Sequence, residues 1–226
     1  MSSQFHHIPS LLKPEELTIL EQLITASAFV SGKATASMAA KEVKNNQQLE
    51  RAADGYMDQI QGILSNAIET SPYFQAASQP KQIHPFLISK YVPGQYYGWH
   101  VDSPIMGTPP IRTDLAMTVF LSEPLSYEGG ELVIQAEVGP IAFKPAKGDA
   151  ILYPCQFLHC VNDVKKGERL AAVTWIQSNF QSTEKRQLLF DLNQVHALLQ
   201  QKDKHSPEAN LLLQSYSNLF RMWADV

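Results

Sequence analysis

The sequence predicts an α+β fold: a mainly β core, a sandwich or barrel of about eight strands, preceded and followed by helices. Residues 83–178 hold short apolar stretches at regular spacing, separated by turn residues such as Pro93-Gly94 and Gly129-Gly130. Residues 14–28, 47–70 and 182–223 instead repeat apolar side chains at helical spacing. The spacing of apolar residues changes from helical to extended near Ile83 and becomes helical again after Ser178. These two changes set the limits of the β core.

The composition excludes several classes of function. The chain has 226 residues, a net charge of −4 and an isoelectric point near 6.0, so nothing indicates nucleic acid or an anionic membrane as a partner. The first residues lack a signal-peptide pattern, and no apolar run approaches the roughly 18 residues of a membrane span. Cys155 and Cys160 are the only cysteines, and their spacing favours free thiols in a reducing compartment. We therefore expect a cytoplasmic protein.

Two helices are predicted in the N-terminal part of the chain. Pro14 suits a first helical position, and the leucines that follow it recur at helical spacing to about residue 28. Residues 30–44 are small and polar, as in a loop or short extended pieces. A second helix is predicted over residues 47–70, and Ser71-Pro72 ends it because the residue before proline avoids the helical conformation.

The β core is predicted strand by strand from period-two patterns and turn residues. Residues 103–110 contain three prolines and a glycine, so we expect a loop without regular pairing that borders the site described below. The predicted strands cover residues 86–92, 95–102, 114–121, 131–135, 141–145, 149–153, 158–161 and 170–178.

Helical period returns after the β core. Ser182 or Thr183 can cap a helix that runs to about Leu199, and Ser206-Pro207-Glu208 begins a second one. The chain is thereby divided into a helical support region (1–80), a β domain (81–178) and a C-terminal helical region (179–226). The apolar last helix would cover the barrel or a second copy of the chain, so a homodimer is one expected arrangement.

A cluster of metal-ligand residue types organises the β domain. His100 and Asp102 are separated by one residue on a predicted strand, which places both side chains on one face. His159, at the start of a later strand, is the best candidate for a third ligand. Two histidines and one carboxylate form the facial triad of non-haem Fe(II) oxygenases. The alternative is that these three are polar residues of the core.

A basic residue follows the third candidate ligand by ten positions. Arg169 precedes a fully apolar strand, so we interpret it as a buried receptor for a carboxylate, which a guanidinium binds through two hydrogen bonds. On the strand of His100, the alternation predicts that Tyr96 shares the ligands' face, whereas Tyr97 and Trp99 face the opposite way, with Trp99 in the core.

The sequence resembles a known family at these positions. His100-Val101-Asp102, His159 and Arg169 are similar to the His-x-Asp…His…Arg pattern of Fe(II)- and 2-oxoglutarate-dependent dioxygenases of the prolyl/lysyl hydroxylase domain type. Further similarity to the bacterial PKHD-type hydroxylases associated with iron uptake spans nearly the whole chain. The segments that carry it include 112–121, 127–132, 171–178, 188–192 and 218–223.

The resemblance implies a fold and a set of site residues. The fold is the double-stranded β-helix, or jelly roll. His100, Asp102 and His159 would bind Fe(2+), and Arg169 would bind the C5-carboxylate of 2-oxoglutarate. Animal members place a tyrosine hydroxyl beside that arginine, but the comparable residue here is Phe120. We expect either Tyr91 or Thr118 to supply a hydroxyl in its place.

The resemblance also implies an activity, namely hydroxylation of a substrate C–H bond with release of succinate and CO2. The substrate stays open among a prolyl- or lysyl-type peptide, an amino acid and an iron-chelating small molecule, with a link to iron homeostasis and L-ascorbate as a further reductant. Two alternatives are a zinc-dependent hydrolase and a metal-binding jelly roll without turnover. Arg169 argues against the hydrolase, which has no general need for a carboxylate receptor there.

Overall fold

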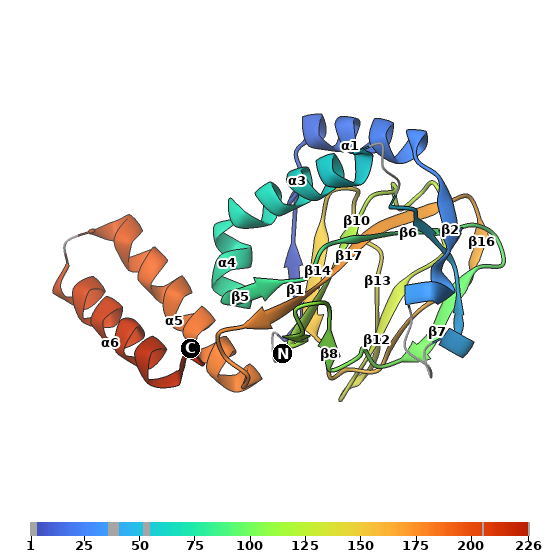
Figure 1. Cartoon of the computed structure of the whole chain (residues 1–226). Coiled ribbons are helices and arrows are strands. Elements are labelled where there is room, and N and C mark those ends of the chain that lie inside the picture. The colour runs from blue at the N-terminus through green and yellow to red at the C-terminus, as the bar shows by residue number, and fades with distance from the viewer. Residues whose placement is uncertain (1–3, 36–40, 52–54, 205, 226) are drawn as a thin grey trace.

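Two facing antiparallel sheets form the β core of the computed structural model, which describes residues 4–35, 41–51, 55–204 and 206–225 (Figure 1). The strands of the larger sheet are β1 (His6–Ile8), β2 (Phe29–Ser31), β4 (Gln47–Leu49), β5 (Pro80–Ile83), β6 (Leu87–Tyr91), β10 (Leu115–Phe120), β14 (Ala150–Pro154) and β17 (Arg169–Ser178). They lie in the order β1-β14-β10-β17-β6-β4-β2, and β5 pairs with β17.

The smaller sheet closes over the first. It has the order β13-β12-β15-β7-β3 and consists of β3 (Lys44–Asn45), β7 (Tyr96–His100), β12 (Leu132–Ala136), β13 (Gly139–Phe143) and β15 (His159–Val161). Along the chain, β6, β10, β14 and β17 belong to the larger sheet, and β7, β12 and β15 alternate with them in the smaller one. This alternation is the jelly roll, so the predicted fold class is confirmed.

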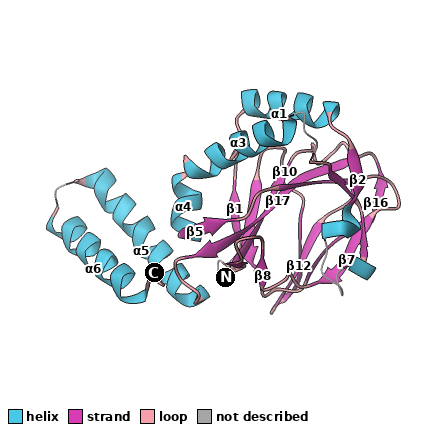
Figure 2. Ribbon diagram, viewed as in Figure 1, coloured by secondary structure: helices cyan, strands magenta, loops and turns pink. Residues whose placement is uncertain are grey.

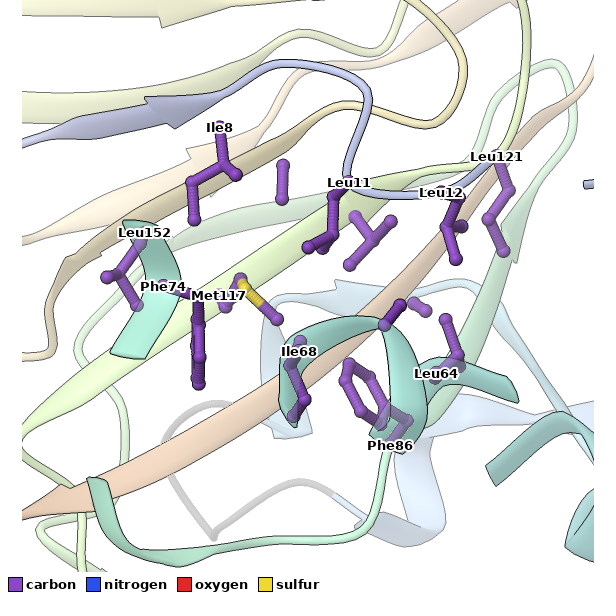
Figure 3. Packing of buried hydrophobic residues seen from close by; sticks show 14 of the residues in the cluster. Ile8, Leu11, Leu12, Leu64, Ile68, Phe74, Phe86, Met117, Leu121 and Leu152 are labelled. Carbon is purple, nitrogen blue, oxygen red and sulfur yellow. The ribbon is translucent and has the colours of Figure 1, made fainter. Parts of the chain in front are cut away.

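Three helices cover the outer face of the larger sheet (Figures 1 and 2). They are α1 (Pro14–Ala26), α3 (Tyr56–Glu69) and α4 (Pro72–Ser78). Their apolar faces meet the sheet in one core, where Leu64, Ile68 and Phe74 from the helices pack with Met117 and Leu152 from the strands (Figure 3). Each such side chain contributes about 1.5–3 kcal/mol when it is fully buried. The helices therefore fix the outer face of the sheet whose inner face borders the cavity.

The last two helices, α5 (Thr183–Lys202) and α6 (Pro207–Trp223), form a hairpin that projects from the body of the molecule (Figure 2). The predicted caps are confirmed: the Ser182 hydroxyl accepts a hydrogen bond from the backbone of Lys185, and that of Ser206 from Ala209. Among the described residues, no helix is long and apolar enough to cross a membrane.

The predicted second helix was wrong over its first residues. Gln47–Leu49 is strand β4, which pairs with both β2 and β6, and α3 begins only at Tyr56. Gly55, in the left-handed conformation at φ +76°, turns the chain into that helix. The hydrogen bonds of the sheet thus override the helical spacing of the apolar residues in this stretch.

Two further expectations need correction. The strand of the first candidate ligand ends at His100, so Asp102 lies in the loop that follows it. The loop expected over residues 103–110 contains a short strand, β8 (Ile105–Met106), which pairs with β9 (Ile111–Arg112). A second short pair joins β11 (Glu128–Gly129) and β16 (Val164–Lys166). Pairs this short give little sequence signal, because two residues hold hardly one period of alternation.

Candidate active site

The structure brings His100, Asp102 and His159 together at one end of the cavity between the sheets. His100 ends β7, His159 begins β15, and these two residues are directly paired in the smaller sheet. Asp102 reaches the same point from the loop after β7. One potential ligand atom from each side chain lies within 4.8 Å of the other two, so three donors converge on one point.

The hydrogen bonds of the two imidazoles orient their free nitrogens toward Asp102. Nδ1 of His100 lies 2.8 Å from the carbonyl of Gly98, and Nδ1 of His159 lies 3.0 Å from that of Phe157. A carbonyl oxygen only accepts, so Nδ1 carries the proton in both rings and Nε2 keeps its lone pair. These two Nε2 atoms lie 3.9 and 3.7 Å from the oxygens of Asp102, too far for hydrogen bonds.

The electrostatics of this cluster keep the imidazole of His100 available to a cation. Burial, with a smaller contribution from the neighbouring His159, lowers the pKa of His100 to about 4, although the charge of Asp102 opposes that shift. Oδ2 of Asp102 is buried and has no hydrogen-bond partner among the described residues. A buried carboxylate oxygen without a partner is costly. A cation held between Asp102 and the two Nε2 atoms would remove that cost, and the donor set suits Fe(2+).

Arg169 lies at the start of β17 and is only 1% exposed. Its guanidinium lies over the rings of Tyr91 and Phe120, at 5.1 and 5.5 Å from their centroids. Nε of Arg169 is buried and has no hydrogen-bond partner among the described residues. The space for this side chain depends on Gly130, where an added Cβ would come within 3.1 Å of Cδ of Arg169. A buried guanidinium with an unused donor fits a carboxylate ligand.

The two hydroxyl-bearing candidates both line the cavity. Tyr91 contacts Arg169, and burial raises the pKa of its phenol although the guanidinium opposes that shift. Thr118 is buried on β10 beside Tyr153. Burial raises the pKa of Tyr153 well above its usual value, as does the charge of Asp102, while a hydrogen bond with Thr118 lowers it. Tyr91 therefore lies beside the arginine, whereas Thr118 is tied to a second tyrosine.

The predicted orientation was wrong for Tyr96 and Tyr97, and Trp99 faces away from the cavity as predicted but is exposed instead of lying in the core. Tyr97 faces the cavity, and its ring stacks on His100 with centroids 3.6 Å apart. Tyr96 and Trp99 are 41% and 46% exposed. The register shifts within this pair of strands, since His159 lies opposite His100 but Val161 lies opposite Tyr97. The extra residue on β7 is a β-bulge, which inverts the alternation on one side of it.

Sequence reasoning missed a second set of cavity residues. Lys44, Asn46 and Gln48 are buried, line the cavity and come from the segment in which the chain crosses from β3 to β4. Burial lowers the pKa of Lys44 to about 8, against the charge of Asp102, which raises it. Their period-two spacing is a strand signal that the helical interpretation of residues 47–70 obscured. The free thiols of Cys155 and Cys160 are buried but do not line the cavity.

Comparisons with known proteins agree with this site. Residues 86–177 match the family model of the 2OG-Fe(II) oxygenase superfamily, and residues 184–225 match that of the PKHD-type hydroxylase C-terminal domain. A PKHD-type hydroxylase from Crocosphaera subtropica is 40% identical over 96% of this chain and 98% of its own length. Another, from Thermosynechococcus vestitus, is 42% identical over 97% of this chain and 98% of its own length.

Solved structures support the fold. A prolyl-4-hydroxylase from Pseudomonas putida aligns with a TM-score of 0.55 and 16% identity, over 77% of this chain and 92% of that one. A prolyl hydroxylase from Trichoplax adhaerens, in complex with a hypoxia inducible factor peptide fragment, aligns with a TM-score of 0.58 and 15% identity, over 83% of this chain and 87% of that one. Sequence identities this low support a shared jelly-roll fold but no conclusion about activity or substrate.

Fold, cavity and matched superfamily model together define an Fe(II)- and 2-oxoglutarate-dependent oxygenase. Within that class, identity of about 40% along almost the full length shows that the chain belongs to the PKHD-type hydroxylases. It is accordingly an oxidoreductase, a dioxygenase that uses Fe(2+) and 2-oxoglutarate.

Proposed function

We propose that His100, Asp102 and His159 bind the iron of this enzyme and that Arg169 binds the distal carboxylate of 2-oxoglutarate, with Tyr91 beside it. The single observation that carries the assignment is the pair of buried, unmatched polar atoms, Oδ2 of Asp102 and Nε of Arg169, in one cavity. The carboxylate oxygen of Asp102 can bind a cation, and the N–H of Arg169 can donate a hydrogen bond to an anion. We further propose that Thr118 acts on the cofactor site indirectly, through its hydrogen bond with Tyr153 in the wall of the cavity.

The protein's part in the reaction is to bind and to orient. The carbonyls of Gly98 and Phe157 hold both imidazoles with Nε2 toward Asp102, which preorganises the ligands. Arg169 fixes the far end of the keto acid and therefore its direction in the cavity. When bound, iron and 2-oxoglutarate couple the oxidative decarboxylation of the keto acid to hydroxylation of a substrate C–H bond, which yields succinate and CO2.

The substrate that we propose is a prolyl- or lysyl-type peptide, an amino acid or an iron-chelating small molecule, hydroxylated at a C–H bond. A role in iron homeostasis, the use of L-ascorbate and a homodimer remain parts of the same proposal. We also propose that the protein is located in the cytoplasm, because its two cysteines are free thiols and a reducing compartment keeps thiols free.

An anaerobic titration tests the assignment. Metal-free protein receives iron(II) and then 2-oxoglutarate, and the visible charge-transfer band of the chelated keto acid is followed. We expect the band in the parent protein, a need for more 2-oxoglutarate in Arg169→Ala, and no band in His159→Ala. His196→Ala is the matched control, because His196 lies in α5 outside the cavity. No band in the parent, with tight zinc binding instead, would support the hydrolase or the metal-binding module.

A further inference from the structure

The three candidate metal ligands are supported in two different ways. His100 and His159 lie on paired strands of the smaller sheet, and a backbone carbonyl orients the ring of each. Asp102 lies in the loop after β7, and Oδ2 of its carboxylate has no hydrogen-bond partner among the described residues. The position of this carboxylate therefore depends on what holds the main chain around it.

Thr113 holds the main chain directly after Asp102. Its hydroxyl donates a hydrogen bond to the carbonyl of Ser103 at 2.6 Å, and its backbone N–H donates one to the carbonyl of Pro104 at 3.0 Å. Thr113 is only 7% exposed, so water has little access to these bonds and their strength is kept. Two bonds from one residue to consecutive carbonyls limit the movement of the loop that carries Asp102.

Thr113 lies between β9 and β10 and is fixed to the larger sheet. The next residue, Asp114, donates from its backbone N–H to the carbonyl of Ile176 on β17 at 3.0 Å. Its carbonyl accepts a hydrogen bond at 3.1 Å from the backbone N–H of Cys155, which follows β14. The larger sheet thus supports Asp102 through Thr113, whereas the smaller sheet carries the two histidines. The candidate ligands therefore span both sheets.

Arg112 holds the residues on both sides of Thr113. Its guanidinium donates two hydrogen bonds to the carboxylate of Asp114, at 2.7 and 3.0 Å, and a third to the carboxylate of Asp225 at 3.1 Å. Asp225 follows α6, and its backbone N–H donates to the carbonyl of Asn179, directly after β17, at 2.8 Å (Figure 1). The end of the C-terminal hairpin thereby takes part in the support of Thr113.

We propose that Thr113 is a positioning residue of the metal site, which holds Asp102 where the two imidazoles converge, and that Arg112 keeps Thr113 in place. The proposal rests on the function proposed above, because it takes Asp102 as a ligand of iron. A ligand that is already held in its binding position loses less conformational freedom when the metal binds. Loss of the groups that hold a metal ligand costs about tenfold to a hundredfold in metal affinity.

Thr174 provides a matched control for the hydroxyl of Thr113. It is fully buried in β17, and its hydroxyl also donates to a backbone carbonyl, that of His84 before β6. Thr113→Val and Thr174→Val each keep the shape of the side chain and remove one hydroxyl donor, so both variants should be less stable than the parent protein. Only Thr113→Val should lose metal affinity, because His84 is not next to a candidate ligand in the chain.

Anaerobic equilibrium titration with iron(II) measures the affinity of each variant, and urea unfolding measures its stability. We expect Thr113→Val to bind iron(II) about tenfold more weakly than the parent protein, and Thr113→Ser, which retains the hydroxyl, to recover most of that loss. Thr174→Val should bind iron(II) as the parent does. Where Thr113→Val does not fold, Arg112→Met takes its place and should bind iron(II) more weakly than Arg221→Met, in which an exposed arginine of α6 is removed.

The outcomes separate the two proposals. If Asp102→Asn weakens iron(II) binding but Thr113→Val loses no more affinity than Thr174→Val, the role of Thr113 is overturned while the proposed function stands. Equal iron(II) affinity of Arg112→Met and Arg221→Met overturns it in the same way where Thr113→Val is unfolded. If Asp102→Asn binds iron(II) as tightly as the parent protein, Asp102 is not a ligand. The proposed function itself then fails, and this inference fails with it.

Discussion

Two buried clusters of this molecule each pair a histidine with an arginine, and they differ in how completely their polar atoms are matched. One is the cavity, with His100 and Arg169. The other, the seam cluster, consists of His6, Tyr73, Arg186 and Phe190 where β1, α4 and α5 meet. Burial lowers the pKa of both histidines to about 4, and both arginines are at most 4% exposed. Burial and pKa therefore do not distinguish the clusters.

The hydrogen bonds of the two clusters do distinguish them. Arg186 donates to the carbonyls of Phe180 and Gln181, at 2.6 and 3.2 Å, and to the Thr183 hydroxyl at 3.1 Å. Nδ1 of His6 is 3.2 Å from the Tyr73 hydroxyl. In the cavity, Oδ2 of Asp102 and Nε of Arg169 have no hydrogen-bond partner among the described residues. The arginine and histidine of the seam cluster are thus bonded within the protein, whereas these two cavity atoms are left for ligands.

The largest expected effect is on metal binding. Asp102→Asn keeps the shape of the side chain but removes the only negative charge among the described residues that line the cavity, so we expect iron(II) affinity to fall about a hundredfold or more. His6→Gln, in the seam cluster, is expected to leave that affinity unchanged. Anaerobic equilibrium titration of both variants measures the difference. Equal losses in the two would show that the comparison between the clusters is wrong.

The two arginines give a reciprocal prediction. Arg169→Met should weaken 2-oxoglutarate binding about tenfold to a hundredfold, because the carboxylate loses its charged partner. Arg186→Met should leave that affinity intact but lower the free energy of unfolding by about 2–4 kcal/mol, since it leaves buried carbonyl acceptors unsatisfied.

Calorimetric titration with 2-oxoglutarate and urea unfolding, both applied to each arginine variant, separate these effects. A loss of stability without a loss of affinity in Arg169→Met would contradict its proposed role. Arg221→Met is a suitable control, because Arg221 is exposed on α6 and bonds only Asn218 among the hydrogen bonds described for it.

Local sequence signals predicted the parts of the fold that depend on short-range chemistry. Pro14, Ser182 and Ser206 marked the starts of α1, α5 and α6, because capping and proline geometry act within one turn. The apolar runs of β10, β14 and β17 were equally plain. The candidate ligands and Arg169 could be picked out because their residue types and order are characteristic, and the structure does bring them into one cavity.

The features that were missed depend on pairing between distant strands. The bulge on β7, which turns Tyr97 toward the cavity, exists only in its register with β15. Strand β4 is held by β2 and β6, and no local pattern states that partnership. Lys44 and Asn46 likewise reach the cavity because β3 pairs with β7 and β4 pairs with β6, which are distant from them in the sequence. The division into three regions at residues 80 and 178 stays a prediction, although residues 1–80 supply strands to both sheets.

The seam cluster predicts a pH dependence. His6 has a folded-state pKa of about 4 against an ordinary value of 6.5, so the unfolded chain binds a proton between these values and the folded chain does not. Stability is therefore complete above pH 6.5 and falls as the pH drops toward 4, by roughly 1–3 kcal/mol from this residue. His6→Gln can still bond Tyr73 and should lose less stability over that range. Urea unfolding of the parent protein and of His6→Gln at pH 7 and pH 4.5 measures this loss. If the free energy of unfolding falls equally in both proteins between these pH values, His6 is not the group responsible.

The smallest expected effect tests how closely β3 approaches β7 at the cavity edge. Gly98 bonds the carbonyl of Val43 at 2.9 Å, and a Cβ at Gly98 would meet Cβ of Val43 at 2.9 Å. Because that atom is close to the backbone, Gly98→Ala must push the two strands apart, and we expect a destabilisation of about 1–2 kcal/mol. Gly62→Ala is the control: it lies in α3, where the new Cβ meets nothing within 4 Å, and it should stabilise by about 0.5–1 kcal/mol. Urea unfolding of both alanine variants measures the difference, and equal stability of the two would show that β3 does not approach β7 this closely.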